Sequence, residues 1–95
     1  MHMFLVNEYF DGKVKSIAFQ TDEGPATVGV MAPGDYNFGT SSIEFMTVTS
    51  GLMSVLLPGE TEWKDFRDFE TFRVEKDKNF QVKVLEDTSY RCLYK

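Results

Sequence analysis

Short runs of β-branched and aromatic residues follow one another along the whole chain, and turn-forming residues separate them. Runs of roughly four to eight such residues, bounded by Gly, Pro, Asn, Asp or Ser, are typical of β-strands. No segment has the apolar period of a long amphipathic helix. The pattern predicts strands over residues 13–20, 26–31, 35–40, 43–50, 52–57, 63–66, 71–74, 80–85 and 89–94.

This series of short strands predicts an all-β sandwich or barrel. The chain has 95 residues, which is enough for one hydrophobic core but too few for two. It contains no linker, repeat or low-complexity segment. We therefore expect a single domain over residues 1–95.

Alternation along two of the strands places several candidate residues on the inner face, because side chains in a strand point to opposite sides with a period of two. Tyr36, Phe38 and Thr40 share one face, and Glu44 shares a face with the apolar Met46. An inward carboxylate costs several kcal/mol unless it is paired or reaches water. Glu44 is therefore either a strand-end residue in contact with solvent or part of a pocket.

The last predicted strand has Tyr90, Cys92 and Tyr94 on one face. Cys92 is interpreted as a small buried apolar residue, since free cysteine commonly packs in this way. It is the only cysteine, so no internal disulfide can form, which favours a reducing cytoplasm. The only histidine is His2, so no cluster with metal-ligand spacing is expected.

Charge and hydropathy exclude several partners. The formal net charge is −5, with dispersed basic residues, and non-specific nucleic-acid binding depends on a basic face. No apolar run approaches the roughly 20 residues that span a bilayer. We expect neither a nucleic-acid polymer nor a membrane as a partner, although a small phosphorylated ligand needs only one or two basic residues.

The segment from Gly34 to Gly51 resembles the first motif of the cupin barrels, in which two histidines precede a glutamate and a glycine follows. Glu44, six residues and then Gly51 match the end of that motif, while Phe38 and Thr40 stand at the histidine positions. The resemblance implies a single-domain, cupin-like double-stranded β-helix barrel of the jelly-roll type, without the usual metal ligands.

A more specific resemblance extends over nearly the whole chain. It is carried by Asn7-Glu8-Tyr9-Phe10, Gly12-Lys13-Val14-Lys15-Ser16-Ile17, Val28-Gly29-Val30-Met31, Met46-Thr47-Val48, Val55-Leu56-Leu57-Pro58 and Thr88-Ser89-Tyr90. In these stretches the chain is similar to the pyrimidine/purine nucleoside phosphorylase family. The resemblance implies a pentosyltransferase that cleaves purine and pyrimidine nucleosides with inorganic phosphate to free base and pentose 1-phosphate, without metal or other cofactor. The chain departs from the family pattern at Phe69, Glu75 and Lys76, which bears on substrate preference.

Phosphorolysis develops positive charge on the sugar and requires a held phosphate. With the implied activity, Glu44 is predicted as the catalytic residue, which stabilises the sugar cation or binds ribose hydroxyls. Tyr36, Phe38, Thr40 and Tyr90 are predicted to bind the substrate, because aromatic rings stack on any base. Ordinary core packing is the alternative for each ring.

Lys15 is the first candidate for a phosphate contact and Lys13 the second, because both belong to the family-like run; Arg73 and Arg91 are alternatives. The alternative for Lys15 is a solvated strand lysine. A homodimer is expected by analogy with small cupins. The alternative function is a non-catalytic cupin that binds a small aromatic or phosphorylated ligand.

Overall fold

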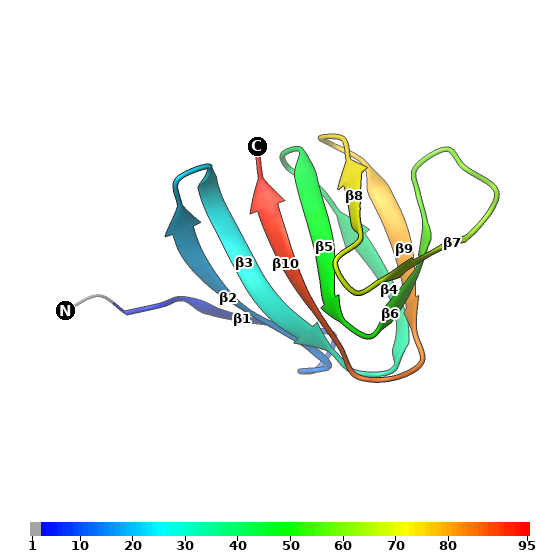
Figure 1. The fold of residues 1–95 in the computed structure, drawn as a ribbon, viewed down its shortest axis with the longest axis horizontal. Coiled ribbons are helices and arrows are strands. Elements are labelled where there is room, and N and C mark those ends of the chain that lie inside the picture. The colour runs from blue at the N-terminus through cyan, green and yellow to red at the C-terminus, as the bar shows by residue number, and fades with distance from the viewer. Residues whose placement is uncertain (1–2) are drawn as a thin grey trace.

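The computed structural model describes residues 3–95, which form ten strands and no helix. Figure 1 shows their arrangement. The strands are β1 (Val6–Tyr9), β2 (Val14–Thr21), β3 (Gly24–Met31), β4 (Gly34–Gly39), β5 (Glu44–Ser50), β6 (Leu52–Leu56), β7 (Lys64–Arg67), β8 (Thr71–Val74), β9 (Asn79–Val84) and β10 (Thr88–Tyr94). The predicted all-β class is confirmed. In the described part of the chain there is thus no helical segment that could cross a bilayer.

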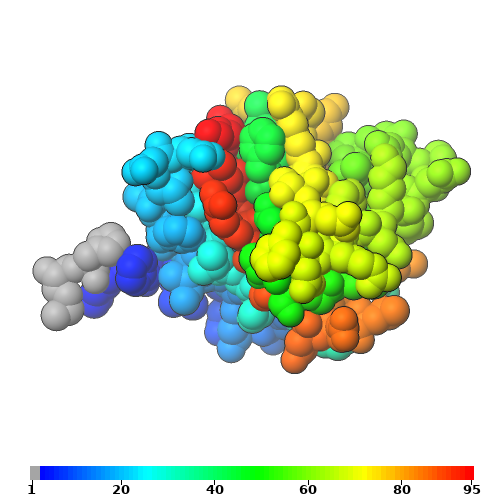
Figure 2. Space-filling model, viewed as in Figure 1, coloured from blue at the N-terminus to red at the C-terminus, as the bar shows by residue number. Residues whose placement is uncertain are grey.

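The strands form two antiparallel sheets. One has six strands in the order β1-β2-β3-β10-β5-β8, and the other has four in the order β4-β9-β6-β7. In Figure 1, β3, β10 and β5 lie in front of β4, β9 and β6. Figure 2 views the outer face of the larger sheet, where the colours of β3, β10, β5 and β8 follow that order. Because the chain crosses repeatedly between the sheets, strands distant in sequence become neighbours, as in a jelly roll.

The hydrophobic core lies between the sheets and follows from alternation along the strands. In β9 every second residue is buried, namely Phe80, Val82 and Val84. In the larger sheet, Met46 and Val48 of β5 are buried, as alternation along this strand predicted. The two inner faces therefore exclude water together, which is what holds a sandwich of this size together.

Each predicted strand agrees with an observed one within two residues at both ends. Conversely, one observed strand, β1, was not predicted. Its four residues are exposed or only half-buried, so its sequence has no alternation to detect. The strand β3 also begins earlier than predicted and includes Pro25. The pairing of β3 with β10 begins only at the next residue, Ala26. The missing N–H of Pro25 therefore interrupts no pairing with β10.

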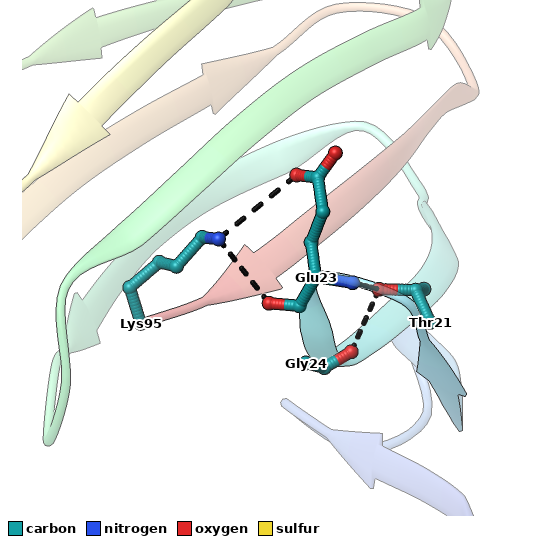
Figure 3. A network of polar contacts seen from close by, with 4 residues as sticks. All are labelled: Thr21, Glu23, Gly24 and Lys95. Atoms are coloured by element: carbon teal, nitrogen blue, oxygen red, sulfur yellow. Dashed lines mark hydrogen bonds and ion pairs between the residues drawn. The ribbon is translucent and has the colours of Figure 1, made fainter.

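A small polar network fixes the turn between β2 and β3 against the end of the chain (Figure 3). Thr21 Oγ1 donates to the carbonyl oxygen of Gly24 at 2.8 Å and accepts from the backbone N–H of Glu23 at 3.1 Å. Lys95 Nζ donates to the carbonyl oxygen of Glu23 at 3.2 Å. This exposed network contributes little energy, but it keeps the hairpin beside the end of β10.

The departures from the family pattern lie in turns. Phe69 has a φ of 69°, a left-handed conformation that glycine adopts without strain. Glu75 forms an ion pair with Arg73, with an Nε–Oε1 distance of 3.0 Å. Lys76 precedes the turn residue Asp77, whose φ is 60°. All three departures are accommodated at the ends of strands.

Candidate functional site

A cavity of about 510 Å³ lies between the inner faces of the two sheets. This volume lies within the range of about 300–1,000 Å³ that is usual for small-ligand sites. The larger sheet contributes seven of the lining residues, and the smaller sheet with its adjoining loop and the β1–β2 turn contribute the others. The lining consists of Tyr9, Ser16, Met31, Glu44, Met46, Tyr90 and Tyr94, and of Asn37, Phe38, Gly39, Ser41, Phe80 and Phe10.

Strand register brings the polar lining residues of the larger sheet together. Ser16 pairs with Gly29, and Gly29 pairs with Tyr90, so these residues form one row across β2, β3 and β10. In a second row, Tyr94 of β10 lies opposite Glu44 of β5. Since residues of one row share a face, hydroxyls and a carboxylate meet on the cavity wall.

Glu44 is half-buried at this wall. The thiol of Cys92 donates to its Oε1 with an Sγ–Oε1 distance of 3.5 Å. Burial raises the pKa of the Glu44 carboxyl, and the hydrogen bond from Cys92 opposes this only in part. Within residues 3–95 no Lys or Arg forms an ion pair with Glu44. The cavity therefore holds a desolvated carboxyl without a neutralising cation, which supports its assignment to a pocket.

The thiol and phenol groups around Glu44 are held in their neutral forms. Cys92 is fully buried, as the sequence predicted, and burial raises the pKa values of its thiol and of the Tyr94 phenol. Tyr94 Oη lies 3.0 Å from Thr27 Oγ1. Burial raises the pKa of Tyr90 to about 12, while a hydrogen bond with Ser16 lowers it in part. At neutral pH these phenols remain protonated and can donate hydrogen bonds.

Aromatic rings form the opposite side of the cavity. Phe38 lies with its ring centroid 5.5 Å from Phe80, 6.1 Å from Tyr36 and 5.5 Å from Phe10. Tyr36 is buried and donates its hydroxyl to the carbonyl oxygen of Ala32 at 2.5 Å. It packs beside the lining ring Phe38 but is not itself among the lining residues.

Thr40 lies on the predicted face but is also outside the cavity lining. Its hydroxyl donates to the carbonyl oxygen of Glu75 at 2.7 Å and accepts from the backbone N–H of Lys78 at 3.0 Å. Because both functions of the hydroxyl are used, Thr40 fastens the β8–β9 turn to the end of β4. Of the predicted residues, Glu44, Phe38 and Tyr90 come together at the cavity.

The basic candidates lie elsewhere. Lys15 is exposed and pairs with Glu8, with an Nζ–Oε1 distance of 3.3 Å, and neither Lys15 nor Lys13 lines the cavity. Arg73 stacks over Phe45 with its guanidinium carbon 5.5 Å from the ring centroid. The cavity lining, as far as the chain is described, includes no Lys, Arg or His. Likewise, no three His, Cys, Asp or Glu side chains of residues 3–95 come together as metal ligands.

Several lining residues were missed by the sequence reasoning, namely Tyr9, Phe10, Ser16, Asn37, Ser41 and Tyr94. Tyr94 had a detectable signal, because alternation places it on the face of Tyr90. Phe10 and Ser41 lie in turns, where alternation does not apply.

Comparison with known sequences decides the family. A sequence model described as "pyrimidine/purine nucleoside phosphorylase" matches residues 4–94. The chain belongs to this family. It is similar to the pyrimidine/purine nucleoside phosphorylase of Alcanivorax borkumensis, with 65% identity over 97% of this chain and 98% of the relative. The Pseudomonas putida (strain W619) member is 58% identical over 98% of this chain and 99% of its own length.

Solved structures have the same fold. A Vibrio parahaemolyticus protein described as having unknown function is 40% identical and has a TM-score of 0.92, with 96% of this chain and 97% of that chain covered. The cupin domain of Drosophila melanogaster CENP-C has a TM-score of 0.73 at 13% identity, covering 97% of this chain and 75% of that chain. The likeness to the cupin domain concerns the fold alone and confirms the predicted cupin-like architecture.

Proposed function

We propose that this chain catalyses phosphorolysis of purine and pyrimidine nucleosides. A phosphate oxygen forms a bond to the anomeric carbon, the bond from that carbon to the base nitrogen breaks, and the base leaves with its electron pair and takes up a proton. The products are free base and pentose 1-phosphate. The observation that carries the proposal is the 65% identity, over 97% of the chain, to a pyrimidine/purine nucleoside phosphorylase.

The cavity has surfaces suited to each part of a nucleoside. Phe38 offers an aromatic face for the base, and stacking accepts every base because each has a π-face. Ser16, Asn37 and the Tyr90 phenol offer donors and acceptors for the sugar. Tyr36 supports Phe38 from behind the cavity surface, and Thr40 holds the turn next to it, so we assign both to positioning the site.

We assign Glu44 to the sugar. A carboxylate in a poorly hydrated site interacts strongly with positive charge that develops on the sugar in the transition state. Its two possible contacts remain the sugar cation itself and a ribose hydroxyl. If the hydroxyl is the contact, replacing Glu44 should lower kcat/KM less for a 2′-deoxynucleoside than for the corresponding ribonucleoside.

Among the described residues, the cavity lining has no cation that could hold phosphate. Hydroxyl and amide donors at the cavity, or a lysine outside its lining, would have to hold the anion. Lys13 and Lys15 remain the candidate lysines. Lys13→Ala and Lys15→Ala should raise the KM for phosphate and leave the KM for nucleoside unchanged; equal phosphate KM values in both variants and the parent would remove this assignment.

The deciding experiment measures base release by the purified protein from uridine, cytidine, thymidine, adenosine, guanosine and inosine, with and without phosphate. We expect free base and pentose 1-phosphate only when phosphate is present, and the same rate after exhaustive chelation. Equal release without phosphate would indicate a hydrolase. Binding of nucleosides without release would support the alternative, a non-catalytic cupin.

We also propose a homodimer in the cytoplasm. Ile17, Val28 and Val30 on the outer face of β2 and β3 are 41%, 42% and 53% exposed, and clustered exposed apolar residues commonly mark a protein contact. Size-exclusion chromatography with light scattering measures the mass in solution. The mass of a single chain would contradict the homodimer.

A further inference from the structure

The turn between β1 and β2 places a bulky residue in an unusual conformation. The backbone N–H of Gly12 donates to the carbonyl oxygen of Tyr9 at 3.2 Å, and the two central residues, Phe10 and Asp11, have φ values of 53° and 57°. Such turns favour Asn, Asp and Gly at both central positions. Asp11 fits this preference, but Phe10 does not, because a left-handed conformation is unfavourable for a large side chain.

The contacts of Phe10 account for this conformation. Its ring centroid lies 4.9 Å from that of Tyr36 and 5.5 Å from that of Phe38, at interplanar angles of 54° and 87°. A residue of the larger sheet thus packs on β4 of the smaller sheet and bridges the two walls of the cavity. Phe10 is nevertheless 41% exposed, so its ring is only partly covered by these partners. A partly open ring at a cavity wall has a free surface for a ligand.

We propose that Phe10 and Phe38 form an aromatic clamp that stacks on the nucleobase, with Tyr36 behind them as support. This inference rests on the proposed function and identifies Phe10 as a further substrate-binding residue for it. Both rings line the same cavity, and their near-perpendicular arrangement offers one face and one edge to a planar base. A clamp that contacts the π-face rather than the hydrogen-bonding edge of a base does not distinguish purines from pyrimidines.

The competing explanation is that Phe10 is only an apolar plug of the cavity. Two substitutions separate these roles, because Phe10→Leu keeps an apolar side chain without a π-face, whereas Phe10→Trp keeps a π-face. For a stacking clamp, Phe10→Leu should raise the nucleoside KM roughly tenfold or more, with Phe10→Trp close to the parent. The KM for phosphate should not change in either variant.

Phe69→Ala is the matched control. Phe69 is also a left-handed aromatic turn residue, with a φ of 69°, but it is 79% exposed and does not line the cavity. Its removal should leave both KM values within twofold of the parent. Circular dichroism and the melting temperature of every variant establish that the fold is intact.

Direct binding makes the result independent of turnover. Calorimetric titration with uridine and adenosine should give weaker binding to Phe10→Leu than to the parent and to Phe69→Ala, even if the parent releases no base and the proposed function fails. Equal affinities of Phe10→Leu and the parent for both nucleosides would overturn the clamp. Absence of nucleoside binding to the folded parent would overturn it as well.

Discussion

Gly29 offers a sharp test of the cavity wall, because one added methyl group has no room there. A Cβ at this position would lie 2.5 Å from the carbonyl oxygen of Lys15, and 2.7 Å and 2.8 Å from Oη and Cζ of Tyr90. Comfortable contacts of this kind are about 3.5–4.0 Å. One obstacle is the backbone of the neighbouring strand and the other is a buried ring, so neither can move aside cheaply.

The expected cost of Gly29→Ala follows from two opposing terms. Overpacking that shifts backbone and side chains costs about 1–3 kcal/mol, while the loss of glycine's freedom in the unfolded chain returns about 0.4–1 kcal/mol. Since backbone and ring are both obstructed, we expect a net loss of about 2 kcal/mol. In a domain of this size that corresponds to a fall in melting temperature of roughly 8–16 °C.

Thermal unfolding followed by circular dichroism measures this loss against Gly39→Ala. The nearest atom to a Cβ at Gly39 is Oδ1 of Asn79 at 3.2 Å, the end of a side chain that can rotate away. Gly39→Ala should therefore change the melting temperature by no more than a few degrees. If both variants melt within about 2 °C of the parent, the close packing of Tyr90 on Gly29 is refuted.

Three further predictions concern Glu44 and Thr40. Glu44→Gln should keep the fold and lower kcat/KM about 10²-fold, which is the usual effect of losing one electrostatic stabiliser. A steady-state kcat/KM within threefold of the parent would instead support the alternative that Glu44 is a solvated strand-end residue. The pKa of Glu44 is raised above its ordinary value of 4.5, so its contribution to stability is fully present below that value and is lost as the pH rises through the folded-state pKa. Urea unfolding should therefore show that Glu44→Gln gains stability relative to the parent as the pH rises above about 4.5, and a constant difference would contradict the buried state. Thr40→Val should cost about 1–3 kcal/mol by leaving the N–H of Lys78 and the carbonyl of Glu75 without their partner; an unchanged urea-unfolding midpoint would count against that role.

Much of the fold could be predicted because burial imposes a period of two on each inner strand. The predicted strand over residues 71–74 coincides with β8, and β9 alternates along its whole length. The same rule sorted Glu44, Phe38 and Tyr90 to faces of their strands, and the structure brings these three residues to one cavity. It could not detect β1, whose residues are buried on neither face.

The rest of the site escaped prediction for two physical reasons. Alternation does not show which face of β2 is inner, since Ile17 is apolar and yet 41% exposed, and Lys15 shares that outer face. It also says nothing of turns, so the inward placement of Phe10 depends on left-handed φ angles that a phenylalanine rarely adopts. Thr40 lies on the inner face as expected, but its hydroxyl is committed to the β8–β9 turn, which no strand pattern reveals.

The single neighbour of β1 has a consequence for how a ligand reaches the cavity. In the described chain, Val6–Tyr9 pairs with β2 alone and at the edge of the sheet, and segments with few buried contacts open at lower free energy than the core. Backbone amides of β1 should therefore exchange hydrogen for deuterium sooner than those of β10; equal protection would refute this. If the β1–β2 turn moves with β1, such an opening releases Phe10 from β4 while the other strands of both sheets stay paired. Ligand exchange then proceeds at the rate of a local fluctuation and does not require the sandwich to separate.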